Sequence, residues 1–306
     1  MKIVESSVQI LEQGPGIEGL YEHMETVGRI SHMSDKVPGS SSLAFLNRIK
    51  ELGHWAVFDH GTVYLKVPVE FSFLPGSSRI YDLFSCKWVE DVVWKGYHYI
   101  TTTYRTILKL GLEDLMVMLW CDPIPGLHKL RVTSKWVCSR SIANEVVRHR
   151  AFSFIQESTR FINYSREKFG TELTFIVPEW VERFRTEEKY KNLGKVELWN
   201  ALLSDSVPVV SRRMKTWEDA ESEYLWEVLG KELIPGDARG CLPGDLKTEF
   251  YMTGYLGDYY MEPGEGSTEK LGFFYLREAK DAHPDVRVLA QELDKQMKEK
   301  YYEDKE

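Results

Sequence analysis

The sequence has no long apolar run and no leader-like N-terminus. Its longest uninterrupted apolar run, Leu115 to Cys121, has seven residues, whereas a helix that spans a bilayer needs about 20. The opening residues MKIVESSVQI do not combine a basic segment, an apolar segment and a small-residue cleavage site, so they indicate no secretory signal. These absences exclude a membrane-spanning helix and predict a cytoplasmic protein.

Cysteines are few and isolated. Cys86, Cys121, Cys138 and Cys241 form no C-x-x-C pair and have no histidine at a metal-ligand spacing, and no H-E-x-x-H string occurs. This pattern excludes a disulfide framework and predicts no metal site. We expect reduced thiols, most of them buried.

Basic residues are outnumbered by acidic ones, 39 to 47, which gives the 306-residue chain a net charge of -8. The chain nevertheless contains 9 Trp, 16 Tyr and 14 Phe, and burial of these side chains can offset the entropy of ordering, so extensive disorder is excluded. There is no repeat, low-complexity tract or linker-like shift in composition. We therefore expect one domain over residues 1–306.

Hydrophobic patterning predicts strands and helices in irregular order. β-Branched and aromatic residues predict strands at 2–11 and 62–72. Helices are predicted at 97–120, where the threonines at 101–103 weaken the start, at 141–152 with Ser141 as N-cap, and at 213–232, ended by Pro235-Gly236. A last helix is predicted to begin at Pro284 and to bury four side chains: Val286, Leu289, Leu293 and Met297. Without regular β-α alternation, this mixture favours an α+β fold, a mixed sheet packed with helices.

One glycine-rich string resembles a nucleotide-binding loop. Residues 14–19, GPGIEG, spell G-x-G-x-x-G. However, Pro15 lacks an amide donor, and Glu12 and Glu18 place negative charge where a pyrophosphate would lie. The string therefore predicts a turn rather than a nucleotide site.

Positive charge is concentrated in the middle of the chain. Seven Lys and Arg lie between Arg131 and Arg166, opposed only by Glu145 and Glu157. Arginine forks bind phosphate and carboxylate groups, and interleaved serines add donors. A solvated basic face is the simpler alternative. Because apolar residues flank these arginines, they emerge from a largely buried element where unpaired cations are costly, which favours a bound anion.

The same segment resembles a family signature. Residues 148–160, RHRAFSFIQESTR, are similar to the R-H-R-x-x-S-x-x-x-x-S-x-R motif of the flavin-dependent thymidylate synthases. Three further stretches match in order. Residues 53–60 resemble G-H-x-x-x-F-E-H with Asp59 for Glu, residues 238–243 resemble A-R-x-x-L-P, and Leu276-Arg277 with residues 282–286 resembles L-R…A-Q-x-E-I. The resemblance covers about residues 20–70 and 131–295, and leaves 71–129 as a probable insertion.

The resemblance implies a flavin-dependent thymidylate synthase fold and an enzyme, a methyltransferase. It would convert dUMP to dTMP by reductive methylation, with methylene tetrahydrofolate as carbon donor and FAD reduced by NADPH as hydride donor. It also implies a homotetramer with shared active sites. Its partners would be small-molecule substrates, with no nucleic acid and no membrane.

Site residues are implied by the same resemblance. Arg277 would contact the uracil and act as the catalytic residue, where a charged fork can stabilise developing negative charge. The residues implied to bind dUMP are Glu145, Arg148, Gln156, Ser158, Thr159, Arg160, Arg239 and Arg277. The residues implied to bind the flavin are His60, Thr62, Arg148, His149, Arg150, Gln156 and Gly272.

Several positions depart from the family pattern. Glu145 stands where Gln is common, and beside a phosphate its carboxylate would be repulsive unless it faces a cation or a sugar hydroxyl. Gly272 and residues 266–268 fall where polar side chains usually contact the flavin, so backbone groups would have to replace them. His60 is equally compatible with a hydrogen-bonded buried histidine, and Cys241 is expected to pack rather than react.

Two other classes of function stay open from the sequence. A nucleic-acid-binding module could stack bases on Phe152, Phe154, Phe161 and Tyr164, although the net charge of -8 opposes it. A non-catalytic nucleotide-binding or scaffold protein on the same fold is the other.

Overall fold

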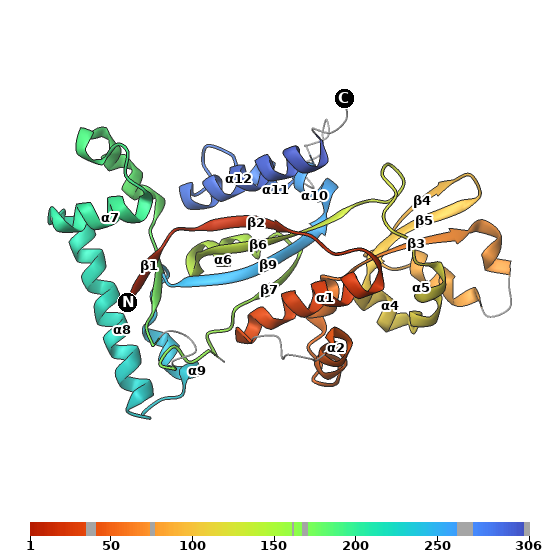
Figure 1. Cartoon of the computed structure of the whole chain (residues 1–306), viewed down its shortest axis with the longest axis horizontal. Helices are drawn as coiled ribbons and strands as arrows, with labels where there is room; N and C mark the ends of the chain where they lie inside the picture. Colours follow the sequence, from red (N-terminus) through yellow and green to blue (C-terminus); the bar gives the residue numbers. More distant parts are fainter. Residues whose placement is uncertain (35–40, 74–76, 161, 167–170, 262–271, 303–306) are drawn as a thin grey trace.

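A four-stranded antiparallel sheet forms the centre of the computed structural model, which describes residues 1–34, 41–73, 77–160, 162–166, 171–261 and 272–302. Its strands run in the order β2 (Ser7–Leu11), β6 (Arg131–Ser139), β9 (Lys247–Tyr255) and β7 (Ser153–Gln156). Two smaller sheets and several helices surround it (Figure 1). This combination confirms the predicted α+β class, while the single domain with an insertion at 71–129 stays a prediction.

One face of the central sheet carries an apolar core. Alternate residues of β6 and β9, among them Trp136, Phe250 and Met252, are fully buried there because side chains of a strand alternate between its faces. The helices that supply the other half of this core are α6 (Arg140–Val146), α10 (Leu256–Tyr260), α11 (Phe273–Arg277) and α12 (Pro284–Tyr301). Helix α12 begins at Pro284 and buries all four side chains predicted for it.

The opposite face is partly polar and lies against α1 (Gly16–Arg29), where Thr133 of β6 and Thr253 of β9 point. Helix α1 also packs on α2 (Ser42–Glu51) and on the antiparallel sheet β3-β5-β4. That sheet and its helices have these bounds: β3 Thr62–Pro68, β4 Glu90–Trp94, β5 Tyr97–Thr103, α3 Tyr81–Phe84, α4 Tyr104–Leu110 and α5 Glu113–Leu119. Strand β3 thus precedes the expected insertion and pairs with β5 inside it.

A third core lies at the end of the molecule that holds the N-terminus (Figure 1). Here β1 (Lys2–Val4) pairs in parallel with β8 (Thr174–Ile176), beside α7 (Lys195–Ser204) and α8 (Pro208–Leu229). The Trp217 ring is stacked between Phe175 and Trp199, with centroids at 4.9 and 4.7 Å.

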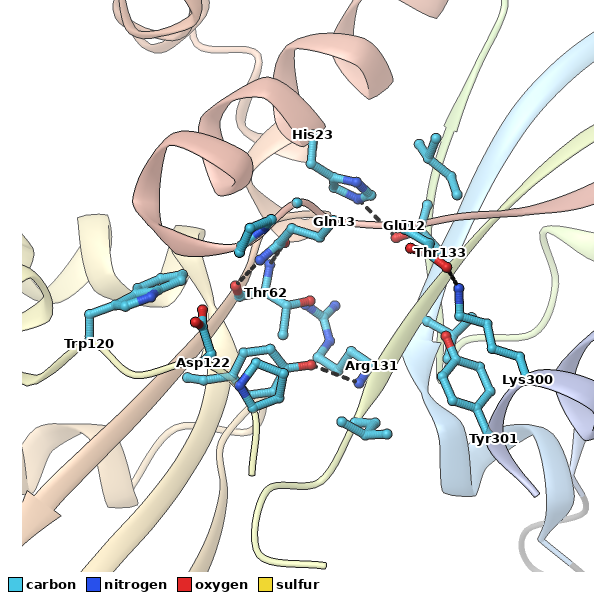
Figure 2. Close-up of a pocket in the computed structure, with 17 residues that line it drawn as sticks. Glu12, Gln13, His23, Thr62, Trp120, Asp122, Arg131, Thr133, Lys300 and Tyr301 are labelled. Atoms are coloured by element: carbon cyan, nitrogen blue, oxygen red, sulfur yellow. Dashed lines mark hydrogen bonds and ion pairs between the residues drawn. The ribbon is translucent and has the colours of Figure 1, made fainter. Parts of the chain in front are cut away.

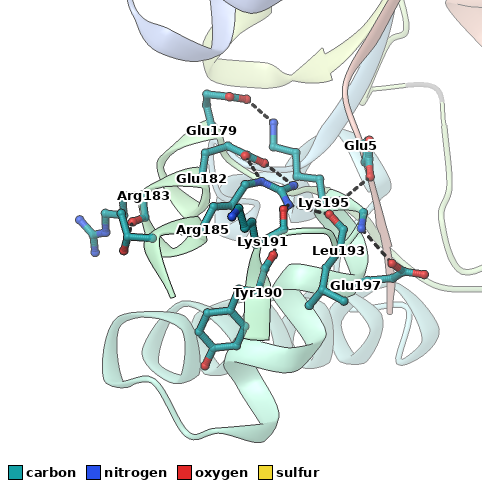
Figure 3. A network of polar contacts seen from close by, with 12 residues as sticks. Glu5, Glu179, Glu182, Arg183, Arg185, Tyr190, Lys191, Leu193, Lys195 and Glu197 are labelled. Carbon is teal, nitrogen blue, oxygen red and sulfur yellow. Dashed lines mark hydrogen bonds and ion pairs between the residues drawn. The ribbon is translucent and has the colours of Figure 1, made fainter. Parts of the chain in front are cut away.

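Ion pairs and hydrogen bonds join separate segments at this end of the molecule (Figure 3). Arg185, in the 3-10 segment η6 (Glu179–Thr186), pairs with Glu182 and donates to the Leu193 carbonyl at 2.6 Å. Lys195 pairs with Glu179, and its amide donates to a Glu5 carboxylate oxygen at 2.9 Å. Segments distant in sequence are therefore joined at the start of α7.

The helix predicted over 97–120 is wrong. Residues 97–103 form β5, which lies between β3 and β4, and two short helices follow instead of one. The reason is the side chains: Tyr, Ile and three consecutive Thr suit a strand with a partner on each side. The chain turns into α4 at Thr103, whose hydroxyl accepts from the Thr106 amide at 3.1 Å, and Gly111 with φ 63° ends that helix.

Other predicted boundaries need correction. The stretch 2–11 is two strands interrupted at residues 5 and 6, and strand 62–72 ends at Pro68. Of the residues 141–152 predicted as a helix, only those up to Val146 are helical, in α6. The N-cap of α6 is Ser139 rather than Ser141. The predicted 213–232 helix is α8, which starts at Pro208 and ends at Leu229, a residue 64% exposed. Pro235 does not stop α8 but begins the short helix α9 (Pro235–Ala238).

The glycine string connects β2 to α1. Gly16, with φ 68°, begins the helix, so only the first part of the string is a turn. A Cβ at Gly19 would lie 2.2 Å from the Gly14 carbonyl carbon, hence the first turn of α1 packs directly on the loop. All four cysteines are free thiols, but only Cys138 is fully buried, fewer than predicted.

Candidate active site

The R-H-R motif lies in the turn after α6. Strand β6 leads directly into α6, and the Ser139 hydroxyl at the junction accepts from the Ile142 amide at 3.4 Å. Three buried side chains of this short helix face the core, so the motif emerges at its end. Arg148 and Arg150 are exposed and form no ion pair with any described residue, whereas His149 is half-buried.

Arg277, Glu145 and His149 meet at this point; we call them the Arg277 cluster. Arg277 at the end of α11 donates through Nε to Nε2 of His149 at 2.6 Å. One terminal nitrogen forms an ion pair with the Glu145 carboxylate, and the other donates to the Glu145 carbonyl oxygen at 3.3 Å. The Arg277 side chain is 18% exposed. Glu145 thus faces a cation, which is one of the two arrangements in which its carboxylate would not repel a nearby phosphate.

The histidine of the cluster is held in its neutral form. Burial, and secondly the positive charge of Arg277, lower the pKa of His149 to about 4. Its ring also packs edge-on against Phe273 at 5.0 Å. Because Nε2 accepts the Arg277 proton donor, the ring proton is on Nδ1. Because His149 is a neutral acceptor, it orients the guanidinium without placing a second positive charge beside it.

The second half of the signature leaves the sheet toward α9. Gln156 donates to the Thr248 hydroxyl at 3.1 Å, so its amide is already engaged. Arg160 is exposed, and a Cβ at Gly236 of α9 would lie 3.8 Å from its carbonyl oxygen. Arg239, three residues further along and also exposed, begins the 3-10 segment η8 (Arg239–Cys241). The two implied phosphate ligands thus belong to adjoining segments.

One chain does not bring all implied substrate ligands together. Helix α9 with Arg160 and helix α11 with Arg277 lie on different sides of the central sheet (Figure 1). The half-buried Ser158 and Thr159 lie beside Arg160, away from the Arg277 cluster. The implied phosphate ligands and the implied uracil contact therefore belong to separate parts of the fold.

The implied flavin ligands are also divided between the two faces of the sheet. His60 is fully buried, and its Nδ1 lies 2.7 Å from the Thr253 hydroxyl on the α1 face. Burial lowers the pKa of His60 well below its ordinary value. Thr62 exchanges two hydrogen bonds of 2.8 Å between its backbone and the Gln13 amide. His149, by contrast, packs on the α11 side.

For the flavin, the residues present fit in part. The unpaired, exposed Arg148 and Arg150 suit an anionic pyrophosphate. Gly272 does not offer a free amide, because its N–H donates to the Met261 carbonyl at 2.6 Å. Residues 266–268 lie outside the described part of the chain.

Sequence reasoning missed the polar residues of the α1 face. His23 of α1 is buried, with Nε2 3.0 Å from the Thr133 hydroxyl, which in turn lies 2.8 Å from Thr253. Arg131, counted only as part of the basic segment, is buried on the same face. The available signal was strand alternation, which places Arg131 and Thr133 opposite the apolar residues of β6.

The described aromatic side chains give little support to a role in stacking nucleic-acid bases. Phe152 and Tyr164 are buried, and the half-buried Phe154 packs on Phe250 with ring centroids 6.2 Å apart. Phe161 lies outside the described residues. The rings that interleave the arginines therefore serve the core.

The described residues lack two kinds of feature. None of their helices combines the length and apolar character needed to cross a bilayer. No three His, Cys, Asp or Glu side chains among them gather as metal ligands would.

With this geometry, the chain can be placed among known proteins. The profile of the family described as Thymidylate synthase complementing protein matches residues 129–301, and the chain belongs to that family. The matched range contains α6, the signature, α9 and α11. It therefore includes the whole Arg277 cluster.

Individual relatives are more distant. The chain is 26% identical over 160 residues to the flavin-dependent thymidylate synthase of Pyrococcus furiosus, which covers 52% of this chain and 51% of that protein. It is 28% identical over 116 residues to the enzyme of the same name from Thermococcus onnurineus, covering 38% and 37%. The chain thus spans 51% and 37% of the length of these two relatives. A crystal structure of a UMP/dUMP methylase PolB from Streptomyces cacaoi, bound with 5-Br dUMP, aligns over 98% of this chain and 93% of its own at 12% identity and a TM-score of 0.40.

Proposed function

We propose that the chain is a flavin-dependent thymidylate synthase that methylates dUMP to dTMP, with methylene tetrahydrofolate as carbon donor and NADPH as reductant. The observation that carries the proposal is the Arg277 cluster. Arg277 and His149 come from two motifs and are 128 residues apart. Glu145 lies three residues before the first motif, and all three residues lie within the family match. The names of the relatives agree with this activity.

Arg277 is the proposed catalytic residue. A guanidinium has five N–H donors, and three of them are used by His149 and Glu145. One N–H on each terminal nitrogen is left, enough for a two-point contact with the uracil edge. The fixed charge would stabilise the negative charge that develops as uracil C5 becomes a nucleophile.

Glu145 and His149 are proposed as positioning residues. Glu145 holds one side of the guanidinium, and neutral His149 accepts from Nε, so the fork cannot rotate freely. Such preorganisation lowers the cost of aligning the charge in the transition state.

The remaining ligands would be shared between subunits. Arg160 and Arg239 would hold the dUMP phosphate, and Arg148 and Arg150 would hold the flavin pyrophosphate, as exposed arginines can. Bound flavin would supply the hydride. Because these residues lie on separate sides of one chain, we expect a homo-oligomer, by family resemblance a tetramer.

Complementation of a thymidine-requiring bacterium tests the proposal. The parent chain should restore growth without thymidine, and Arg277→Ala should not, although it folds. Arg287→Ala on α12 is the matched control and should support growth, since among the described residues the Arg287 side chain donates only to the Lys280 carbonyl, at 2.9 Å. Failure of the soluble parent chain to complement, or growth with Arg277→Ala, would refute the assignment. Purified parent protein should also be yellow and form dTMP from dUMP.

A further inference from the structure

A cavity of about 460 Å³ lies on the α1 face, away from the Arg277 cluster. It is bounded by the loop before α1, by β3 and β6, by the segment after α5, and by the end of α12. Figure 2 shows Arg131, Thr133 and His23 around it, with Lys300 and Tyr301 on one side and Trp120 on the other. The size is that of a small-molecule site.

Arg131 is a buried cation without an ion pair. It is 9% exposed, and within the described part of the chain its terminal nitrogens donate to two neutral oxygens: the Asp59 carbonyl at 2.9 Å and the Thr62 hydroxyl at 3.3 Å. The Asp59 carboxylate instead pairs with Arg105 at 2.7 Å. Among the described residues, no carboxylate forms an ion pair with Arg131, and its Nε has no partner. Such a charge is costly to bury unless something compensates it.

Two further polar groups at the cavity lack partners in the described part of the chain. They are Nδ1 of His23, a side chain 5% exposed, and Nε1 of Trp120. The rest of the wall is largely apolar or aromatic, with Tyr64, Tyr301, Leu130 and the Trp120 ring. An anionic head next to Arg131 and a flat apolar body against these rings would satisfy both kinds of surface.

The charges at the cavity select among anions. Glu12 pairs with Lys300, and Asp122 accepts from the Gly16 amide at 3.2 Å, so each acidic wall residue already has one partner. One guanidinium balances one negative charge, whereas a dianionic phosphate would also be repelled by the two carboxylates. We propose that this cavity is a binding site for an aromatic monocarboxylate, with the carboxylate on Arg131.

The proposal does not depend on the thymidylate synthase assignment. Thr62 lines the cavity and is also an implied flavin residue, but its hydroxyl already accepts from Arg131. The test must therefore separate this cavity both from the Arg277 cluster and from a flavin site.

The probe is 4-fluorobenzoate, followed by fluorine NMR with the full-length protein as purified. We expect binding with a Kd of about 1 mM or lower, and binding of uncharged 4-fluorobenzamide at least tenfold weaker. Arg131→Met should weaken benzoate binding at least tenfold. Leu130→Trp, which fills the cavity but keeps the cation, should do the same and serves if Arg131→Met does not fold. Arg277→Ala should bind the probe as the parent does.

Three outcomes would overturn the proposal. The first is that 4-fluorobenzoate does not bind at a concentration of about 10 mM, or that the amide binds as tightly as the benzoate. The second is loss of binding in Arg277→Ala with retention in the two cavity variants. The third is displacement of the probe by FAD, which would assign the cavity to the flavin.

Discussion

Acid should destabilise the fold through His149, and the effect can be isolated. The pKa of this ring falls from an ordinary 6.5 to about 4 in the folded chain, through burial and Arg277. Between these values the unfolded chain binds more protons, so stability is complete above pH 6.5 and is lost as the pH falls toward 4. If the whole pKa difference contributes, the free energy of unfolding falls by about 2 kcal/mol between pH 7 and pH 5. Because the ring is only half-buried, we expect about 1–2 kcal/mol.

Urea unfolding at pH 7 and pH 5 measures this loss. His23 and His60 titrate in the same direction, so the parent must be compared with His149→Gln, which keeps an acceptor for Arg277 but cannot take up a proton in this range. The variant should lose about 1–2 kcal/mol less than the parent over the two pH values. Val146→Ala, at a fully buried position at the end of α6, just before the His149 turn, lowers stability without removing a titratable group and should keep the parent's pH dependence. Equal losses in the parent and His149→Gln would show that the ring is not held neutral in the folded chain.

Three other substitutions probe packing and chemistry. Trp217→Ala should lower the free energy of unfolding by about 3–5 kcal/mol, because it empties the space between two stacked rings; a loss below about 1 kcal/mol in urea unfolding would contradict the stack. Gly19→Ala should cost about 1–3 kcal/mol, since its Cβ has no room, whereas Gly257→Ala, with open space around its Cβ, should be nearly neutral in the same assay. Cys241→Ser should keep dTMP formation within about tenfold, because burial raises the pKa of this thiol; loss of several orders of magnitude would show that a thiol takes part.

The helix that was predicted most accurately, α12, is marked by local sequence signals. Helix α12 has proline at its first position and a regular apolar stripe, so local rules were sufficient. The stretch 97–120 failed because its apolar residues suit either period, and pairing of β5 with both β3 and β4 decided the outcome. The partner residues in β3 are about 35 positions away and leave no local mark, whereas β4 joins β5 through the two-residue turn Lys95-Gly96, a local signal that the helix prediction overlooked.

The candidate site shows the same division. The family resemblance implied Arg277, Glu145 and His149 as site residues, but it could not show that one carboxylate and one neutral imidazole hold the guanidinium. Nor could spacing show that Arg160 and Arg277 lie on different sides of one chain. His23 and Arg131 belong to no recognised motif, and their importance comes only from burial.

The edge strand β2 links the family-matched region to the rest of the polypeptide. Ser7–Leu11 hydrogen-bonds along β6, and Gln296 of α12 fastens it through the Ile10 amide at 3.1 Å and the Val8 carbonyl at 3.0 Å. A fragment limited to residues 129–301 would leave β6 as a bare edge, open to pairing with other molecules. Such a fragment should self-associate, so the matched region is not an autonomous unit that can be excised for study or fused to another protein.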